Sequence, residues 1–167
     1  MVKKIKVYKN FKINKSHKNS IIFIGNFDGL HIGHQKLFGS ARKYKKKIKL
    51  GVVTFDPIPK MFFNKKISNY RLSNFNQKLI LLKKFNVDFV INKKFDIKFS
   101  KIKAHNFIKD ILFKYIKPKY IFVSNNFRFG NKREGSVLLL KKLEKKFNYK
   151  VVKPKPLIKN KKVISSS

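Results

Sequence analysis

Residues 21–34 read IIFIGNFDGLHIGH, and the expected architecture of the chain follows from this stretch. Four consecutive apolar residues, 21–24, end at a glycine, which is typical of a strand buried on both faces of a sheet. A loop follows over 26–30, and a helix is expected from about His31 to Lys47. A buried strand, a glycine-containing turn and a helix in this order favour a parallel α/β sheet.

Strands and helices keep alternating through the rest of the chain. Short apolar runs predict four more strands, at 50–55, 87–91, 120–123 and 149–152. Apolar positions at helical spacing predict helices after Ser73, near Phe107 and after Ser136, with the two serines as N-caps. Residues 60–71 show no clear period and are expected to form a loop. The pattern predicts a Rossmann-like parallel sheet with helices on both faces, joined by right-handed crossovers.

Ligands of open parallel sheets bind beyond the carboxyl ends of the strands. The loops after the first, second and fourth expected strands should therefore be neighbours at one edge. Those three loops hold the following polar side chains: Asn26, Asp28, His31 and His34; Asp56; and Asn126, Arg128 and Arg133. The whole chain has only seven acids and four arginines, so their gathering at this edge marks a candidate binding site.

Composition limits the classes of protein that remain. The chain has 167 residues, with 43 Lys and Arg against 7 Asp and Glu, and a net charge of +36. The absence of cysteine excludes a disulfide scaffold, Cys-ligated zinc and thiol catalysis. No signal peptide is visible, and no apolar run approaches the roughly 18 residues of a membrane span. We therefore expect a soluble, cytoplasmic domain with no membrane partner.

The positive charge has two interpretations. The lysines are spread along the chain together with many Asn, Ile, Phe and Tyr residues, which favours a bias in base composition over selection for one ligand. The alternative is a basic domain that binds RNA. In either case the positive field attracts polyanions, so we expect weak, non-specific nucleic-acid binding and an environment that favours a phosphate-bearing substrate.

The two histidines of the first stretch suit phosphate chemistry. His31 and His34 are three residues apart at a helix start, so they share a face beside the free N–H groups of the first turn. Gly33 removes a side chain where a ligand would approach closely. No nucleophile paired with a base is present, which favours direct in-line transfer at phosphorus. The alternatives are two surface histidines or a zinc site, although a spacing of three without a glutamate disfavours zinc.

Residues 25–34, GNFDGLHIGH, resemble the HxGH signature of the nucleotidyltransferases, and in detail the FMN adenylyltransferase module of the bacterial bifunctional riboflavin kinase/FAD synthetase family. Further segments resemble that family in the same order: TFDPIP at 54–59, RLS at 71–73, NFRFG at 126–130 with REG at 133–135, and ISSS at 164–167. The resemblance covers about residues 20–167. It implies an α/β fold of the HxGH nucleotidyltransferase type and the reaction FMN + ATP → FAD + pyrophosphate.

The resemblance also implies a role for each site residue. His31 and His34 would be catalytic and would hold the ATP phosphates. The other ATP-binding residues would be Gly25, Asn26, Asp28, Gly33, Ser165, Ser166 and Ser167, and the flavin-binding residues would be Asp56, Asn126 and Arg128. Mg²⁺ would arrive with ATP, since it keeps several waters and needs few protein ligands, and no metal would be held by the protein alone.

Three of these roles have structural alternatives. Asp56 can cap the turn that follows it. Asn126 and Arg128 can simply close a loop whose neighbouring phenylalanines anchor it in the core. The serines at 165–167 can be an ordinary chain end.

We expect residues 1–167 to form a single FMN adenylyltransferase-like domain. The chain stops at Ser167, before the arginine that follows the serines in the family, and it holds no segment resembling the riboflavin kinase β-barrel. A shortened module without kinase activity is expected, and whether it turns over is left open. The alternatives are an adenylyl- or cytidylyltransferase with another acceptor, a basic RNA-binding domain, or a remnant that binds ATP or flavin without turnover. The oligomeric state is not predicted.

Overall fold

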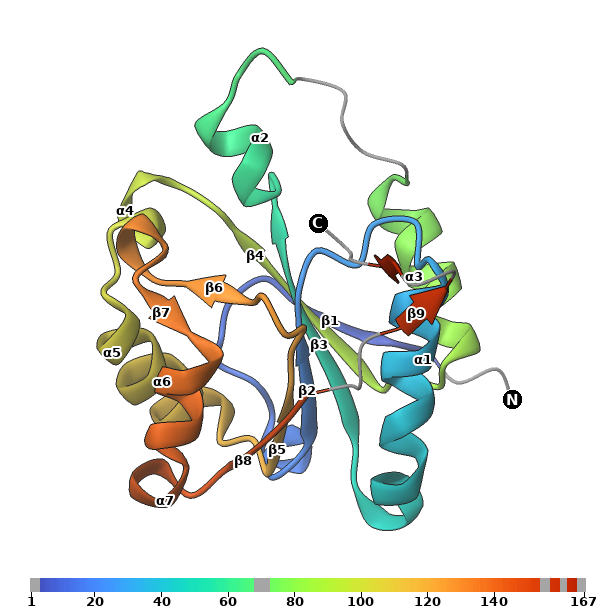
Figure 1. Ribbon diagram of the computed structural model, residues 1–167. Coiled ribbons are helices and arrows are strands. Elements are labelled where there is room, and N and C mark those ends of the chain that lie inside the picture. The colour runs from blue at the N-terminus through green and yellow to red at the C-terminus, as the bar shows by residue number, and fades with distance from the viewer. Residues whose placement is uncertain (1–3, 68–72, 154–156, 160–161, 165–167) are drawn as a thin grey trace.

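The computed structural model describes residues 4–67, 73–153, 157–159 and 162–164 (Figure 1). Six strands form one parallel sheet: β1 (Lys6–Tyr8), β2 (Ile21–Ile24), β3 (Leu50–Asp56), β4 (Phe89–Lys94), β5 (Tyr120–Phe122) and β8 (Lys150–Val152). Their order across the sheet is β1-β4-β3-β2-β5-β8. The predicted Rossmann-like parallel sheet is therefore confirmed.

The strand order reverses beside β2. From β2 the chain moves outward through β3 and β4, and it then returns to pair β5 with the other side of β2. The register sets Ile21 beside Leu50 on one side and beside Tyr120 on the other. In such sheets ligands bind at the carboxyl ends of the two strands where the order reverses. That edge faces upward in Figure 1, towards α2 (Pro59–Phe63).

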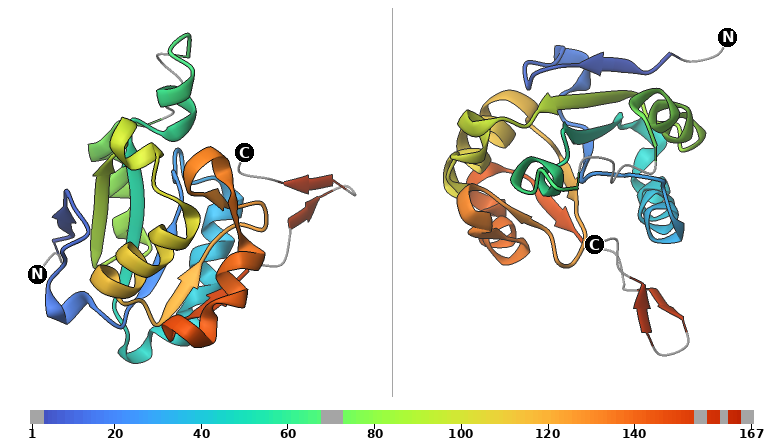
Figure 2. Two further views of the ribbon diagram at one scale, coloured as in Figure 1. Left: turned by 90° about the vertical axis from the view of Figure 1, so that its left-hand side faces the viewer. Right: turned by 90° about the horizontal axis from the view of Figure 1, so that it is seen from above.

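Helices cover both faces of the sheet. One face carries α1 (Ile32–Ala41) and α3 (Phe75–Lys84), and the other carries the π-helical η3 (Phe107–Ile116), α6 (Val137–Lys142) and α7 (Glu144–Phe147) (Figure 2). Shorter helices are η1 (Lys15–His17), η2 (Arg42–Lys47), α2, α4 (Ile97–Ser100), α5 (Ala104–Asn106) and η4 (Asn131–Arg133). Two antiparallel hairpins complete the described elements, β6 (Arg128–Phe129) with β7 (Gly135–Ser136) and β9 (Leu157–Lys159) with β10 (Lys162–Ile164).

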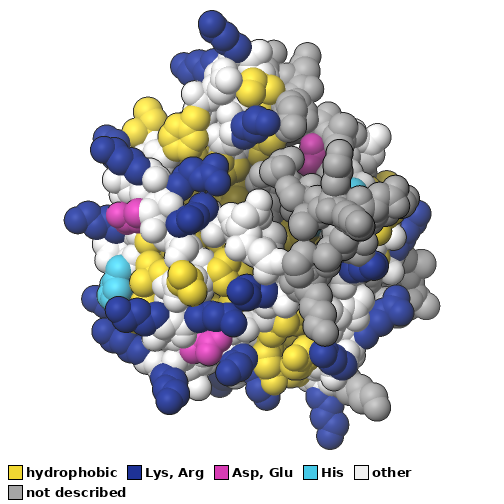
Figure 3. All heavy atoms as spheres, viewed as in Figure 1, with side chains coloured by type: hydrophobic (Ala, Val, Ile, Leu, Met, Phe, Trp, Pro, Cys, Tyr) yellow, Lys and Arg dark blue, Asp and Glu magenta, His cyan; other side chains and the backbone are white. Residues whose placement is uncertain are grey.

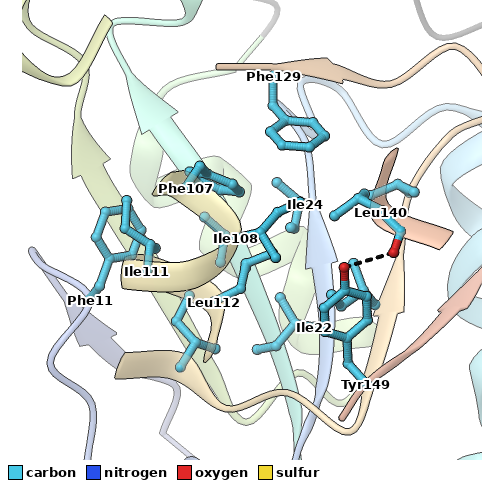
Figure 4. Packing of buried hydrophobic residues seen from close by; sticks show 14 of the residues in the cluster. Phe11, Ile22, Ile24, Phe107, Ile108, Ile111, Leu112, Phe129, Leu140 and Tyr149 are labelled. Carbon is cyan, nitrogen blue, oxygen red and sulfur yellow. Dashed lines mark hydrogen bonds between the residues drawn. The ribbon is translucent and has the colours of Figure 1, made fainter. Parts of the chain in front are cut away.

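Each face of the sheet has its own cluster of buried side chains, because side chains alternate along a strand. In β2, Phe23 packs in the cluster that includes Phe38 of α1 and Leu82 of α3. Its neighbours Ile22 and Ile24 pack in the opposite cluster, against η3 and α6 (Figure 4). The sheet is thus covered on both sides, as the unbroken apolar run of β2 predicts.

The structure contains elements that the apolar pattern did not predict. β1 adds an edge strand beside β4, and lysines interrupt its apolar residues, so it shows no continuous apolar run. Residues 60–71 were expected to be a loop, but α2 begins at Pro59 and ends at Phe63. Proline is favoured in the first turn of a helix because its missing N–H is not needed there, which suits Pro59 to the start of α2. The loop after β5 contains the β6–β7 hairpin.

The predicted helices are present with adjusted ends. The helix expected over 31–47 is α1 followed by the 3₁₀ turn η2. The cap of α3 is Asn74 and not Ser73: Asn74 Oδ1 accepts the N–H of Gln77, whose side chain accepts the N–H of Asn74, both at 2.9 Å. Ser136 is confirmed as the N-cap of α6, since its hydroxyl accepts an N–H of the first turn.

Positive charge is spread over the molecule. Figure 3 shows Lys and Arg side chains distributed over the visible face, without one continuous stripe. The interpretation that base composition accounts for most of the lysines stays a prediction. None of the helices in the described residues has the length and apolar character needed to cross a membrane.

Candidate active site

The loop after β2 turns sharply and is held by buried apolar side chains. Phe27, Gly29 and Leu30 adopt left-handed backbone angles, with φ of 47°, 70° and 39°. Such angles are strained for the two residues that carry side chains, and strained residues persist where their surroundings hold them. Phe27 and Leu30 are 2% and 3% exposed, so the core provides that hold. The turn places His31 at the start of α1.

His31 is the N-cap of α1. Its Nδ1 accepts the N–H of Gly33 at 3.1 Å. A ring nitrogen that accepts a hydrogen bond carries no proton, so the neutral imidazole of His31 holds its proton on Nε2. A Cβ at position 33 would lie 2.9 Å from Cε1 of His31. Gly33 therefore makes room for the histidine ring, whereas the sequence had suggested room for a ligand.

His34 lies one turn further and stacks on His31. The two ring centroids are 3.9 Å apart, with an angle of 28° between the planes. Burial lowers the pKa of His34 to about 4, with further lowering by His31 and Lys78 and an opposing effect of Asp28. His34 is therefore neutral at pH 7.

Each histidine keeps one buried ring nitrogen without a hydrogen-bond partner among the described residues. These atoms are Nε2 of His31 and Nδ1 of His34. Buried polar atoms in native proteins nearly always have partners, and exceptions occur where a ligand binds. The pair, together with the free N–H groups at the start of α1, forms a group of donors that suits a phosphate.

The loop after β2 is tied to α3 and β3 by side-chain hydrogen bonds. Asp28 Oδ1 accepts both the N–H and the hydroxyl of Ser73, each at 2.9 Å. Lys78 of α3 donates from Nζ to the Asn26 carbonyl at 2.6 Å and to Thr54 Oγ1 at 3.4 Å. The Thr54 hydroxyl also donates to the Asn26 carbonyl, at 3.2 Å. Three elements thus meet at the first residues of the loop.

A small pocket lies beside these contacts, at the carboxyl end of β3. It is lined by Asp28, Phe55, Asp56, Ile58, Ser73, Phe75, Lys78 and Asn92, and its volume of about 10 Å³ has room for one water. The structure thus brings two predicted residues, Asp28 and Asp56, to one pocket. The ammonium of Lys78 lines the same pocket, and Asp28 already accepts two hydrogen bonds. Among the residues described, no group of three His, Cys, Asp or Glu side chains lies close enough together to hold a metal ion.

The loop after β5 is anchored by two aromatic rings. Phe127 and Phe129 stack with centroids 5.5 Å apart and an interplanar angle of 17°, and Phe129 is buried. Asn126 precedes Phe127 in the sequence, and Arg128 lies between the two phenylalanines. Both polar residues are exposed. The Ser124 hydroxyl donates a hydrogen bond to Asn126 Oδ1, at 3.0 Å. The anchoring that was one interpretation of this loop is present, and it leaves the polar side chains facing solvent.

The remaining predicted residues have different positions. The Asn26 side chain is exposed while its carbonyl is used within the protein. A Cβ at Gly25 would lie 3.2 Å from the ring of Phe27, so this glycine lets the loop fold back on β2. Arg133 is exposed in η4. Ser165, Ser166 and Ser167 lie outside the described residues.

Sequence reasoning missed Lys78 as part of the site. The available signal was its position in α3, three residues after Phe75 and four before Leu82, on the apolar face of the helix. A lysine on such a face is unusual because burial of its charge is unfavourable without partners. Among 43 basic residues this signal was easily overlooked.

Comparison with known proteins places this chain in a family. The sequence model of the family described as FAD synthetase matches residues 13–167. The bifunctional riboflavin kinase/FMN adenylyltransferase of Buchnera aphidicola subsp. Acyrthosiphon pisum is 40% identical over 157 residues, covering 93% of this chain and 50% of that protein. The Escherichia coli K12 protein of the same name is 34% identical over 78% of this chain and 42% of its own length.

The FAD synthetase of Listeria monocytogenes is 31% identical over 92% of this chain and 63% of that protein. For the bifunctional relatives from Buchnera, this chain spans about half of their length.

Solved structures agree on the fold. The crystal structure of a protein named as a macrolide-efflux protein, from Streptococcus pneumoniae, superposes with a TM-score of 0.78 at 27% identity, covering 96% of this chain and 52% of that one. Pantoate-β-alanine ligase from Francisella tularensis superposes with a TM-score of 0.61 at 17% identity, covering 98% of this chain and 72% of that one, which is a likeness of fold alone. With its parallel sheet, its histidine pair and a family match over nearly its whole length, the chain belongs to the FAD synthetase family.

Proposed function

We propose that residues 1–167 act as an FMN adenylyltransferase domain, which transfers AMP from ATP to the phosphate of FMN and releases pyrophosphate. Membership of the FAD synthetase family supports this activity, as do the names of the relatives. One observation carries the proposal. Two stacked histidines at the first turn of α1 each keep a buried ring nitrogen that has no partner in the described part of the chain.

The triphosphate of ATP would lie at the start of α1. There the free N–H groups and the helix dipole favour negative charge. His31 donates from Nε2, because its Nδ1 already accepts the N–H of Gly33. His34 is neutral and offers its own ring nitrogen beside it. Asn26 and Asp28 would support ATP from the same loop, and a contact of Ser165, Ser166 and Ser167 with the phosphates stays a prediction.

The transfer needs no covalent enzyme intermediate. A phosphate oxygen of FMN attacks the α-phosphorus of ATP, and the bond from that phosphorus to the oxygen bridging to the β-phosphate breaks. The bridging oxygen leaves with pyrophosphate. Negative charge grows on the α-phosphate oxygens in the transition state, where fixed donors stabilise it most. The histidine pair would supply those donors.

Magnesium would enter with the triphosphate. The pocket residues do not fit a cation held by the protein alone, because the Lys78 ammonium lines the pocket together with Asp28 and Asp56. Mg²⁺ keeps several waters and is commonly bound through substrate phosphates. The ion is therefore treated as part of the ATP substrate.

The flavin would approach from the loop after β5. Arg128 is exposed there, and a guanidinium can donate two parallel hydrogen bonds to one phosphate. Asn126 is exposed two residues earlier and carries both a donor and an acceptor. We assign both to FMN, and Asp56 to the part of the flavin site nearest the end of β3.

An acceptor screen tests the proposed reaction. The purified chain is mixed with MgCl₂, ATP or CTP, and FMN, riboflavin or another phosphorylated acceptor, and the products are separated chromatographically. FAD formed only from ATP with FMN is the expected result. Nucleotidyl transfer to a different acceptor would contradict the assignment of FMN. RNA binding with a steep salt dependence, without FAD formation, would favour the basic RNA-binding alternative.

A further inference from the structure

We propose that Lys78 is a positioning residue for the histidine pair: its ammonium joins α3 to the loop after β2 and thereby sets where His31 and His34 lie. This inference rests on the proposed function, because it concerns the same site.

The contacts of Lys78 are unusual for a lysine. The residue is only 7% exposed, on the apolar face of α3. Its Nζ lies 2.6 Å from the Asn26 carbonyl, a short charge-assisted hydrogen bond, and 3.4 Å from Thr54 Oγ1. Burial of an ammonium is unfavourable unless partners compensate it. These partners are the backbone of the loop and a side chain of β3, so the charge is used to join three elements.

The backbone of the loop explains why such a contact is needed. Between Asn26 and His31 the chain passes through left-handed angles at Phe27 and Leu30. Angles of this kind are unfavourable for residues other than glycine and persist only when the surrounding structure holds them. Lys78 holds the start of the strained segment, and the hydrogen bonds from Ser73 to Asp28 hold its middle. The end of the segment is the N-cap that carries the first histidine.

The positive charge of Lys78 also affects the pKa of His34. The charged and titratable groups that act on His34 are its neighbour His31 in α1, Lys78 of α3 and Asp28 of the loop. Burial is the largest cause of the lowered pKa of His34, and the positive charge of Lys78 lowers it further. Removal of the ammonium should therefore raise this pKa, which provides a measurement that does not depend on turnover.

The test compares two lysines of the same helix in the full chain. Lys78→Met removes the ammonium while keeping an unbranched side chain, and Lys84→Met removes one exposed charge from the last turn of α3. The measurements are kcat, the KM values for ATP and FMN, the NMR titration of His34 and amide hydrogen exchange over 26–31. The His34 signal is assigned with His34→Gln.

For Lys78→Met we expect kcat to fall about tenfold or more, because small displacements of catalytic groups have large effects on rate. The KM values should change less than about threefold. The His34 titration should move to higher pH, and exchange over 26–31 should accelerate. Lys84→Met should match the wild-type chain in all four measurements. If Lys78→Met behaves like Lys84→Met in the titration and in exchange, the proposal is wrong.

A second variant covers the case in which Lys78→Met does not fold. Thr54→Val leaves the Lys78 charge in place but removes the hydroxyl that accepts a hydrogen bond from Lys78 Nζ and donates one to the Asn26 carbonyl. We expect faster exchange over 26–31 and a smaller loss of kcat, and unchanged exchange would overturn the proposal. If the wild-type chain forms no FAD, the proposed function fails. The titration and the exchange measurements then still decide whether Lys78 positions the pair.

Discussion

Two loops meet at the carboxyl edge of the sheet, and they are built in opposite ways. The histidine loop, residues 25–34, is held by core side chains and by hydrogen bonds from α3 and β3, and its catalytic candidates are stacked and partly buried. The arginine loop, residues 124–135, is anchored by Phe127 and Phe129 but leaves Asn126 and Arg128 exposed.

The difference suggests that the histidine loop serves the chemical step and the arginine loop serves substrate binding. Groups fixed before the substrate arrives stabilise a transition state without reorganisation, so the histidine loop should act mainly on kcat. Exposed side chains lose conformational freedom when they bind, so the arginine loop should act mainly on the binding of substrate. Substitutions in the two loops should therefore separate kcat from KM.

The largest effect is expected for His31→Ala. Loss of the Nε2 donor should reduce kcat about 100-fold or more, the magnitude found when one fixed transition-state donor is removed. The FMN dissociation constant should change less than about threefold. Steady-state kinetics and fluorescence titration of FMN measure the two quantities, with the exposed His105→Ala as the matched control. Equal losses of turnover and FMN binding in a folded variant would contradict the role assigned to His31.

A smaller loss is expected for Gly33→Ala. The new methyl group would lie 2.9 Å from Cε1 of His31 and must displace the ring, so kcat should fall about tenfold. Gly39→Ala in the same helix is the control, because no atom lies within 4 Å of a Cβ at that position. That control should keep full activity and gain up to about 1 kcal/mol of stability. Unchanged kcat in Gly33→Ala would show that the position of the His31 ring does not limit the rate.

Arg128→Ala tests the other loop. Loss of the exposed guanidinium should raise the KM for FMN about five- to tenfold with kcat within about threefold of wild type. Lys132→Ala, an exposed cation of the same loop, is the control for loss of charge alone. A large fall of kcat with an unchanged KM would place Arg128 in the chemical step and would remove the proposed division between the loops.

The smallest effect concerns the pH dependence of stability. The pKa of His34 in the folded chain, about 4, lies below its ordinary value of 6.5, so between these values the unfolded chain binds the proton more readily. The free energy of unfolding should therefore fall by about 1–3 kcal/mol as the pH falls from 6.5 to 4. Urea unfolding at several pH values measures this. His34→Gln should show a shallower dependence than His105→Gln, and identical slopes would contradict the burial of His34 as the cause.

How much of this site the sequence predicts depends on the distance between the partners. His31, Gly33 and His34 lie within one turn, so their shared face followed from helical spacing alone. The gathering of Asp28 and Asp56 at one pocket followed from the rule that carboxyl ends of parallel strands meet. Lys78 was missed, because its contact with the Asn26 carbonyl spans 52 residues.

The fold shows the same limit. Apolar runs predicted the four inner strands β4, β3, β2 and β5, since burial on both faces leaves a clear signal, and they also predicted the edge strand β8. β1 gave none, because lysines at positions 4, 6 and 9 interrupt its apolar residues and the strand is defined by its pairing with β4. The N-cap of α3 was misplaced by one residue, because Ser73 and Asn74 are both good caps and only the structure shows that Ser73 bonds to Asp28.

The proposed reaction moves the AMP group of ATP onto FMN. The most direct measurement uses ATP labelled with ³²P at the α-phosphate, incubated with the chain, MgCl₂ and FMN. We expect the label to appear in FAD and the pyrophosphate to be unlabelled. His31→Ala should slow the appearance of labelled FAD about 100-fold. Label that remains in ATP or appears only in AMP, while FMN is bound and unchanged, would contradict the proposed reaction.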